Sequence, residues 1–170
     1  MTSASTTSGR AVAHHLLMLK VENRAGVLVR IAGLFSRRGF NIVSLAVAPT
    51  DNDRFSRVSI VVDVESAPLQ QILDQLSKLV NVVEIHEIAP EDATERELLL
   101  ATVKFDHGAR DHFLALTEST GASVVDQRGD LATVMLAGHP DELDAFASAL
   151  TKNGIIELQR TGSIALPKLD

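Results

Sequence analysis

The sequence predicts an α+β protein built from two ferredoxin-like α/β sandwich domains. The first observation is a β-α-β-β-α-β order of apolar and amphipathic segments within residues 13–89. The second is a restart of that order within residues 98–170, after a polar stretch at 90–97 that we expect to be a linker. The third is composition: 45% of the 170 residues are hydrophobic and 22% are charged, as in globular chains with a buried core. Residues 1–12, rich in Ser and Thr, are expected to form a disordered tail.

The first strand and helix follow from the segment between His14 and Gly39. The run "HHLLMLKV" is apolar and predicts a strand, and "NRAG" predicts a turn. Gly39 is expected to end the helix that follows, because glycine tolerates positive φ. The apolar face of this helix is expected to consist of residues spaced by three and four: Leu28, Ile31, Ala32 and Phe35.

A hairpin, a second helix and a last strand complete the first domain. The run "NIVSLAVA" predicts a strand, residues 49–53 a turn, and alternating apolar residues from Val58 to Val64 the returning strand. Ser66 is expected to cap the second helix, whose apolar positions run from Leu69 to Leu79. The run "NVVEIHEI" predicts the last strand.

The second domain is expected to repeat these elements with weaker signals. The run "LLLATVKF" predicts its first strand, and residues 109–119 its first helix. The runs "ASVVDQ" and "LATVMLAG" predict a hairpin around Arg128–Asp130. A second helix is predicted over 141–150, and a single last strand over 155–165.

The sequence of the first domain also predicts a surface that contacts another domain or another chain. Both alternating sets of side chains in its first strand are apolar, so both faces of the sheet need cover. Burial against a second copy of the chain, or against the second domain, satisfies this requirement.

Composition and motifs exclude several classes of function. A net charge of −6 and only six aromatic residues, all Phe, argue against nucleic acid and anionic membranes as partners. No cysteine is present, which excludes disulfides and thiolate chemistry and fits a cytoplasmic protein. No run is apolar and long enough to span a membrane. No catalytic motif such as G-x-S-x-G, H-E-x-x-H or G-x-G-x-x-G occurs.

Two acidic clusters are candidate metal sites, and a plainer explanation fits each. Asp106-His107 with Asp111-His112 is better explained as carboxylates that suit a helix N-terminus. Asp51-Asn52-Asp53 lacks the later glycine and acidic residue of a calcium loop, so a hairpin turn explains it better. We expect no metal and no cofactor in this chain.

The start of the first helix is the candidate binding site. Backbone N–H groups near Gly26, Val27 and Leu28 lack helical acceptors, and the helix dipole makes this end positive, which suits a carboxylate. The side chain of Asn23 can accept from an ammonium and donate to a carboxylate, so it can bind either end of an amino acid. Asn41 can offer the same groups within the subunit or across a dimer. Val27, Leu28, Ile42 and Leu45 are expected to form the apolar wall. The same Asn-x-x-Gly pattern also fits an ordinary helix cap and turn.

Several longer segments of the sequence resemble those of a known protein family. The segments "NRAGVL", "GLFSRRGFNI" and "SLAVAPTD", with "LVNVVEI" and "RELLLATVK" further on, resemble the small regulatory subunits of acetolactate synthase, also called acetohydroxyacid synthase. The match runs from about Leu16 to Ala165. It implies an N-terminal ACT domain that pairs into a homodimer, followed by a ferredoxin-like C-terminal domain.

The resemblance also implies a function and its residues. Such a chain has no activity of its own; it activates a large catalytic subunit that carries thiamine diphosphate, magnesium and FAD, and it confers feedback inhibition. The effector is a branched-chain amino acid, usually valine, with leucine and isoleucine as alternatives, held at the dimer interface. The effector-binding residues that carry over are Asn23, Ala25, Gly26, Val27, Leu28, Asn41 and Ile42.

Two functions from other classes share the fold order. An acylphosphatase-like hydrolase would use an arginine in the loop before the first helix and an asparagine on the next strand, and Arg24 and Asn41 are the candidates. The rest of that family's motif is missing. An RNA-recognition domain needs aromatic residues on its sheet, where this chain has Val58, Ser59 and Ile60.

Overall fold

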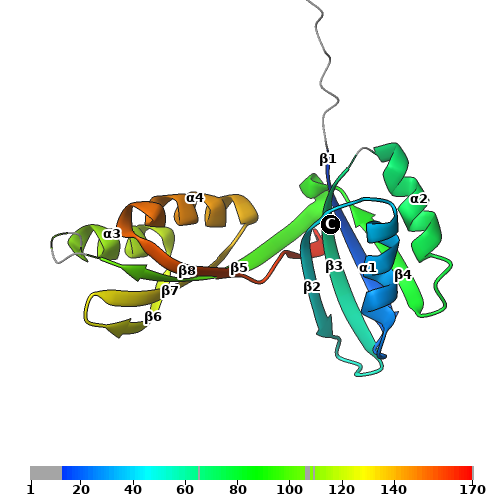
Figure 1. The fold of residues 1–170 in the computed structure, drawn as a ribbon, viewed down its shortest axis with the longest axis horizontal. Helices are drawn as coiled ribbons and strands as arrows, with labels where there is room; N and C mark the ends of the chain where they lie inside the picture. Colours follow the sequence, from blue (N-terminus) through cyan, green and yellow to red (C-terminus); the bar gives the residue numbers. More distant parts are fainter. Residues whose placement is uncertain (1–12, 65, 106–107, 109, 170) are drawn as a thin grey trace, which may run out of the picture. The chain divides into compact units, whose positions relative to one another are not determined.

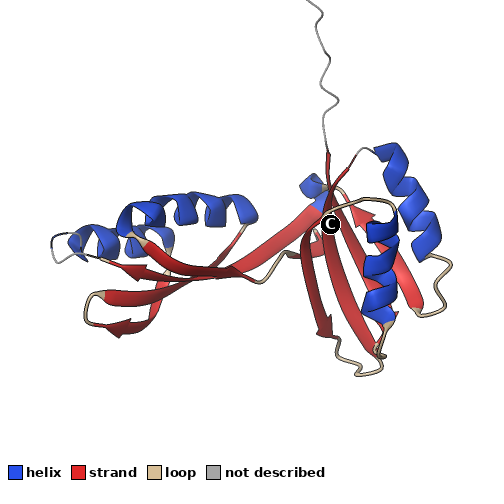
Figure 2. Cartoon of the chain, viewed as in Figure 1, coloured by secondary structure: helices blue, strands red, loops and turns tan. Residues whose placement is uncertain are grey.

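The computed structural model describes residues 13–169 except 65, 106–107 and 109. The expected disordered tail at 1–12 lies outside the described residues. The chain divides into two compact units, residues 1–91 and 92–170. Figure 2 shows that each unit combines a sheet with helices, which confirms the α+β class. In the described part of the chain, no helix has both the length and the apolar character needed to cross a membrane.

The first unit has the predicted β-α-β-β-α-β order. Its four strands form an antiparallel sheet in the order β2-β3-β1-β4, and both helices cover one face of it (Figure 1). This is the ferredoxin-like arrangement expected from the sequence. The elements are β1 (Ala13–Glu22), α1 (Val27–Arg37), β2 (Ile42–Pro49), β3 (Phe55–Val64), α2 (Ser66–Leu76) and β4 (Val82–Ile88).

The core of the first unit lies between the sheet and the helices. Alternate residues of β1 and β3 contribute to it, among them Leu17, Leu19 and Ile60. The buried stripe of α1 differs from the predicted face. Val27 and Ile31 are buried, whereas Leu28 remains 40% exposed. The stripe follows a spacing of four, which turns Leu28 toward solvent and leaves it free for another contact.

The second unit repeats this architecture. Its strands form the order β6-β7-β5-β8, with β9 pairing the beginning of β5, and α3 and α4 cover one face (Figure 1). The elements are η1 (Pro90–Asp92), β5 (Ala93–Lys104), α3 (Arg110–Thr120), β6 (Ser123–Arg128), β7 (Leu131–Gly138), α4 (Pro140–Leu150), η3 (Thr151–Asn153), β8 (Ile155–Arg160) and β9 (Ile164–Pro167).

The expected linker at 90–97 is mostly regular structure. After η1 the chain enters β5 at Ala93, and buried residues alternate with exposed ones from there onward. The two-residue period of a strand was hidden in the sequence because two of the buried positions are glutamates, Glu95 and Glu97, each 7% exposed. A polar composition therefore does not mark a linker here.

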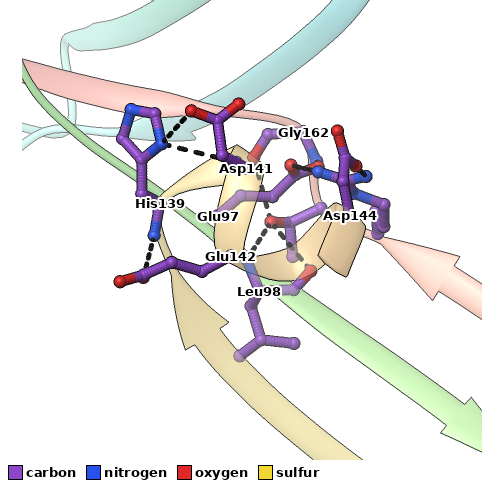
Figure 3. Close-up of polar contacts among 9 residues, drawn as sticks. Glu97, Leu98, His139, Asp141, Glu142, Asp144 and Gly162 are labelled. Atoms are coloured by element: carbon purple, nitrogen blue, oxygen red, sulfur yellow. Dashed lines mark hydrogen bonds and ion pairs between the residues drawn. The ribbon is translucent and has the colours of Figure 1, made fainter. Parts of the chain in front are cut away.

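The single last strand expected over 155–165 is two strands, β8 and β9, separated at Gly162. Gly162 has φ +81, which only glycine adopts easily, and its N–H donates to Glu97 Oε1 at 3.0 Å (Figure 3). The hydroxyl of Thr161 accepts from the N–H of Leu98 at 3.1 Å. β8 and β9 pair with successive parts of β5, so the break redirects the chain without leaving the strand that it follows.

Corresponding residues of the two units are 82 positions apart through the first half of each unit. Gly39 and Gly121 both follow the first helix, with φ +73 and φ +72. The register of β2 shifts around Val43, and that of β6 shifts around Val125, the equivalent position. The two units are thus variants of one structural plan, which allows direct comparison of their sites.

Candidate functional site

The first turn of α1 is open to an anion. Gly26 is the N-cap residue with φ +85 and ψ −8, no side chain caps the helix, and the first turn holds no acidic residue. The amide of Leu28 lies in the first turn, where a helix offers no internal acceptor. The amide of Val27, expected to be free, donates to Arg24 O at 3.4 Å, a long hydrogen bond. No atom lies within 4 Å of the place where a Cβ on Gly26 would sit, so the glycine is required by its backbone conformation.

Asn23 does not cap this helix. Its backbone N–H donates to Arg54 O at 2.8 Å, and its side-chain Nδ2 donates to Asp53 O at 3.0 Å. Both bonds tie the residue to the β2–β3 hairpin and leave its Oδ1 as an acceptor. Of the plain explanation of Asn-x-x-Gly as a helix cap and turn, the structure therefore has the turn, at Ala25 and Gly26, but no cap by Asn23. A surface pocket of about 310 Å³ adjoins Asn23, lined by Glu22, Asn23, Arg24, Asp53, Arg54 and Phe55.

The β2–β3 hairpin positions the partner of Asn23. Asn52 Oδ1 accepts from the N–H of Arg54 at 3.1 Å, and Thr50 Oγ1 accepts from the N–H of Asn52 at 3.2 Å. These local bonds close a tight turn and fix the carbonyl of Asp53. The hairpin turn expected at Asp51–Asp53 is confirmed.

The other end of α1 carries Asn41 and Ile42. The N–H of Phe40 donates to Phe35 O at 3.0 Å and that of Gly39 donates to Ser36 O at 3.0 Å, which is the Schellman termination that Gly39 predicted. The chain then turns into β2 at Ile42. A second surface pocket of about 400 Å³ lies here, lined by Ala32, Phe35, Ser36, Gly39, Phe40, Asn41 and Ile42.

Within one chain, the predicted site residues fall into two groups. Asn23, Ala25, Gly26 and Leu28 lie at the start of α1, whereas Asn41 and Ile42 lie beyond its end. An α-helix of 11 residues is about 16 Å long. A single amino acid cannot bridge that distance, so one copy of the chain does not assemble the predicted set.

The apolar wall also differs from the predicted one. Val27 is 5% exposed, and Ile42 and Leu45 pack against the core, so these three offer little free surface. Exposed apolar side chains instead lie beside Leu28 on α1 and along β2, an edge strand of the sheet: Val29 is 75% exposed, Val43 50% and Val47 45%. The sequence signal for Val43 was obscured, because the register of β2 shifts there.

Charges near the start of α1 are largely compensated. Arg24 Nε lies 3.5 Å from Glu22 Oε2, and Asn81 bridges Arg30 to the same carboxylate through hydrogen bonds of 3.1 and 2.6 Å. On β4, a hydrogen bond from Lys20 holds the pKa of Glu84 below its usual value.

The described residues of the second unit do not repeat the polar groups of Asn23 and Asn41. The residue that follows β5, equivalent to Asn23, is Phe105, which is 4% exposed and stacks on Phe113 with ring centroids 5.1 Å apart. The residue equivalent to Asn41 is Ser123. An apolar core contact thus occupies the position of the polar group of Asn23, while the residues at 106, 107 and 109, equivalent to 24, 25 and 27, lie outside the described part of the chain.

The alternatives gain no support from the geometry. Arg24 and Asn41 lie at opposite ends of α1, so they do not form an acyl-phosphate site in one chain. Val58, Ser59 and Ile60 are each at most 3% exposed, so they offer no platform for bases. Asp106 and His107 lie outside the described residues; among the residues that are described, no group of three His, Asp or Glu side chains fits a metal ion.

Comparison with known proteins identifies the family. Residues 17–84 match the acetohydroxyacid synthase small subunit-like ACT domain, and residues 96–169 match the small subunit of acetolactate synthase. The acetolactate synthase small subunit of Mycolicibacterium smegmatis is 40% identical over 91% of this chain and 91% of its own length. The probable small subunit of Archaeoglobus fulgidus is 40% identical over 89% and 95%.

A solved structure agrees with these relatives. The acetolactate synthase small subunit from Thermotoga maritima matches with a TM-score of 0.87 and 32% identity, over 94% of this chain and 99% of that one. This match covers both halves of the chain, as the two family matches together do. The chain belongs to the family of acetolactate synthase small subunits.

Proposed function

We propose that this regulatory subunit binds a branched-chain amino acid, with valine as the first candidate, in seats shared by two copies of the chain. Each seat combines the start of α1 from one copy with Asn41 and Ile42 from the other. The observation that carries this proposal is the open start of α1 next to an exposed apolar edge. Family membership supports the regulatory role and the partnership with a large catalytic subunit.

A two-fold dimer explains why the site residues are divided. In a symmetric dimer the same surface of both copies meets, so residues at opposite ends of one helix can face each other across the axis. β2 is an edge strand, and β2 together with the neighbouring α1 exposes apolar side chains that water does not favour. Antiparallel pairing of two β2 strands brings the end of β2 in one copy, near the start of α1, close to the beginning of β2 in the other.

The chemistry of the seat matches a free amino acid. The effector's carboxylate binds the open amides at the start of α1, and its ammonium group donates to Asn23 Oδ1. Asn41 of the second copy supplies a further amide. The branched side chain packs against Leu28 and the apolar residues of the interface. Charge-assisted hydrogen bonds contribute about 1.5–3 kcal/mol each, and millimolar binding requires only about 4 kcal/mol, so two or three such bonds suffice.

Effector binding acts on the catalytic partner. The small subunit raises the activity of a large subunit that carries thiamine diphosphate, magnesium and FAD, and the bound amino acid shifts the dimer toward a state that lowers this activation. Such coupling between sites typically amounts to about 1–3 kcal/mol. This chain supplies no catalytic group to the reaction.

Calorimetric titration of the purified chain with valine tests the seat. Gly26→Asp and Gly26→Asn form a matched pair, because both side chains tolerate positive φ about equally while only Asp places a negative charge where the carboxylate binds. We expect Gly26→Asp to abolish the heat of valine binding and Gly26→Asn to weaken it less. Asn23→Ala is expected to weaken binding about tenfold or more. Unchanged heats in Gly26→Asp and Asn23→Ala would disprove the seat.

A further inference from the structure

A third surface pocket lies on the flank of α1 that faces away from β2. It is bounded by α1 and α2, which lie side by side on one face of the first sheet (Figure 1). Its volume is about 210 Å³. Ile72, 1% exposed, contributes an apolar floor. The lining residues are Leu34, Arg37, Arg38, Ile72 and Gln75, and we call this the arginine pocket.

In the arginine pocket, the guanidinium group of Arg38 is bonded to an amide. Arg38 Nη1 donates to Gln71 Oε1 at 2.7 Å, and Gln75 lines the same pocket. Among the described residues, no carboxylate lies within 4.0 Å of a nitrogen of Arg37 or Arg38. A neutral amide can accept a hydrogen bond from an arginine but does not neutralise its charge. Two positive charges therefore lie close together without an acidic partner, on a chain whose net charge is −6.

Gly33 supports the placement of Arg37. A Cβ on Gly33 would lie 3.2 Å from Arg37 Nη1, which means that this guanidinium folds back against the helix where another residue would carry a side chain. Glycine inside a helix is unfavourable by about 1 kcal/mol relative to alanine. The glycine therefore costs the helix some local stability and leaves room for the guanidinium of Arg37.

A simpler explanation is that arginines near the C-terminus of a helix interact favourably with the helix dipole. It explains Arg37 but not Arg38, whose side chain bonds across to α2. The second unit offers a comparison, because the equivalent positions carry Ser119 and Thr120, whose hydroxyls donate to Leu116 O at 3.0 and 2.8 Å. That helix ends without arginine, so the fold itself does not require the pair.

The size of the arginine pocket selects the kind of ligand. Pockets that enclose a free small molecule usually measure about 300–1,000 Å³, so 210 Å³ suits a side chain presented by another protein. Arginine binds carboxylates through two parallel hydrogen bonds and is enriched in protein interfaces. We propose that the arginine pocket docks an acidic side chain of the large catalytic subunit. This inference rests on the proposed function, since it takes the catalytic subunit as the partner.

The flank used is compatible with the proposed dimer. The effector seats and the β2 edge occupy the other side of α1, lined by residues such as Ala32 and Asn41. One helix can therefore contact a second copy on one flank and the catalytic subunit on the other. A conformational change at the dimer interface would then be transmitted to the catalytic subunit through α1.

The test measures the affinity of the full chain for its purified large subunit by biolayer interferometry, at low and high salt. Arg37→Glu/Arg38→Glu reverses both charges, and Arg128→Glu/Lys152→Glu makes the same change in net charge on exposed residues of the second unit. We expect the first pair to weaken binding by about 100-fold and to reduce its salt dependence, and the second pair to change it by less than about threefold. If the double variant does not fold, Arg37→Glu alone is tested instead. It should weaken binding about tenfold.

Two further readouts separate the possible results. Valine heats and the dimer mass of Arg37→Glu/Arg38→Glu are expected to equal those of the unaltered chain. Unchanged affinity for the large subunit, an equal loss in the Arg128/Lys152 control, or a shift from dimer to monomer would each overturn the proposal. Absence of binding between the unaltered chain and the large subunit would overturn the proposed function instead.

Discussion

Glu97 Oε1 accepts the N–H of Gly162 at 3.0 Å, and the other oxygen of the same carboxylate pairs with Arg160 (Figure 3). This buried group joins β5 to the break between β8 and β9. Arg160 also donates to Asp144 on α4, and its hydrogen bond to Glu97, followed by that to Asp144, raises the pKa of Arg160. One carboxylate thus fixes both the backbone turn and the arginine.

Replacing Glu97 tests its structural role. Glu97→Gln keeps the shape but removes the charge, so Arg160 loses its buried partner, and we expect a loss of about 1–3 kcal/mol in the free energy of unfolding. Urea denaturation measures this. Asp144→Asn is the matched control, because Asp144 is 65% exposed and its pair with Arg160 is screened by water, so the expected loss is below about 1 kcal/mol. Equal losses in the two variants would contradict the distinction.

A seat shared by two chains makes a prediction that a seat within one chain does not. Asn23→Ala and Asn41→Ala are each expected to weaken both seats of a homodimer. In a mixed dimer of the two variants, one seat carries both substitutions and the other carries none, so half of the sites should recover the original affinity for valine. Co-expression with two different affinity tags isolates the mixed dimer for calorimetry. No recovery in the mixed dimer would mean that the two residues act on the same seat from one chain.

The bulged valine of the first edge strand is expected to hold the dimer. Val43→Lys places a charge at the contact between two β2 strands, and we expect it to raise the dimer dissociation constant by about tenfold to 100-fold. Sedimentation equilibrium measures this constant. Val125→Lys is the control, since Val125 is the equivalent bulged residue of β6 and both valines are 50% exposed. If only Val125→Lys weakened the dimer, the dimer interface would have to lie on the second unit instead.

The pair between Lys20 and Glu84 predicts a local pH dependence. Because Lys20 lowers the pKa of Glu84 in the folded chain, the stabilisation by this pair is present above the usual value of 4.5 and is lost as pH falls through the lowered pKa. Lys20→Met is expected to move the pKa of Glu84 upward. Carboxyl chemical shifts followed by NMR between pH 2 and pH 7 measure it, and an unchanged titration would show that the ion pair is not formed in solution.

The sequence predicted the elements wherever local signals and long-range packing agree. In the first unit, the strands β1 and β3 and the end of α1 at Gly39 form as predicted, from the apolar run of β1, the apolar alternation of β3 and the glycine. The linker expected at 90–97 is mostly strand, because Glu95 and Glu97 occupy buried positions of β5. For Glu97, the distant partner Arg160 makes that burial tolerable. The break at Gly162 was missed for the same reason, since the group that stabilises it is 65 residues away.

The candidate site was predictable in its chemistry but not in its assembly. The open helix start follows from Gly26 and from the absence of acidic residues in the first turn of α1. The separation of Asn23 from Asn41 follows from the length of α1, which joins them. The exposed apolar residues were not predicted, because the face that α1 turns toward the sheet depends on whether Val27 or Leu28 packs there. Both residues are apolar, so the sequence does not distinguish the two orientations.

Phe105 has a consequence for stoichiometry. An aromatic ring packed against Phe113 stands where the first unit has the polar amide of Asn23. If the proposed seat binds the effector, a dimer with four similar units is expected to bind two amino acids, one for each polypeptide, which is half the number that a simple count of domains suggests.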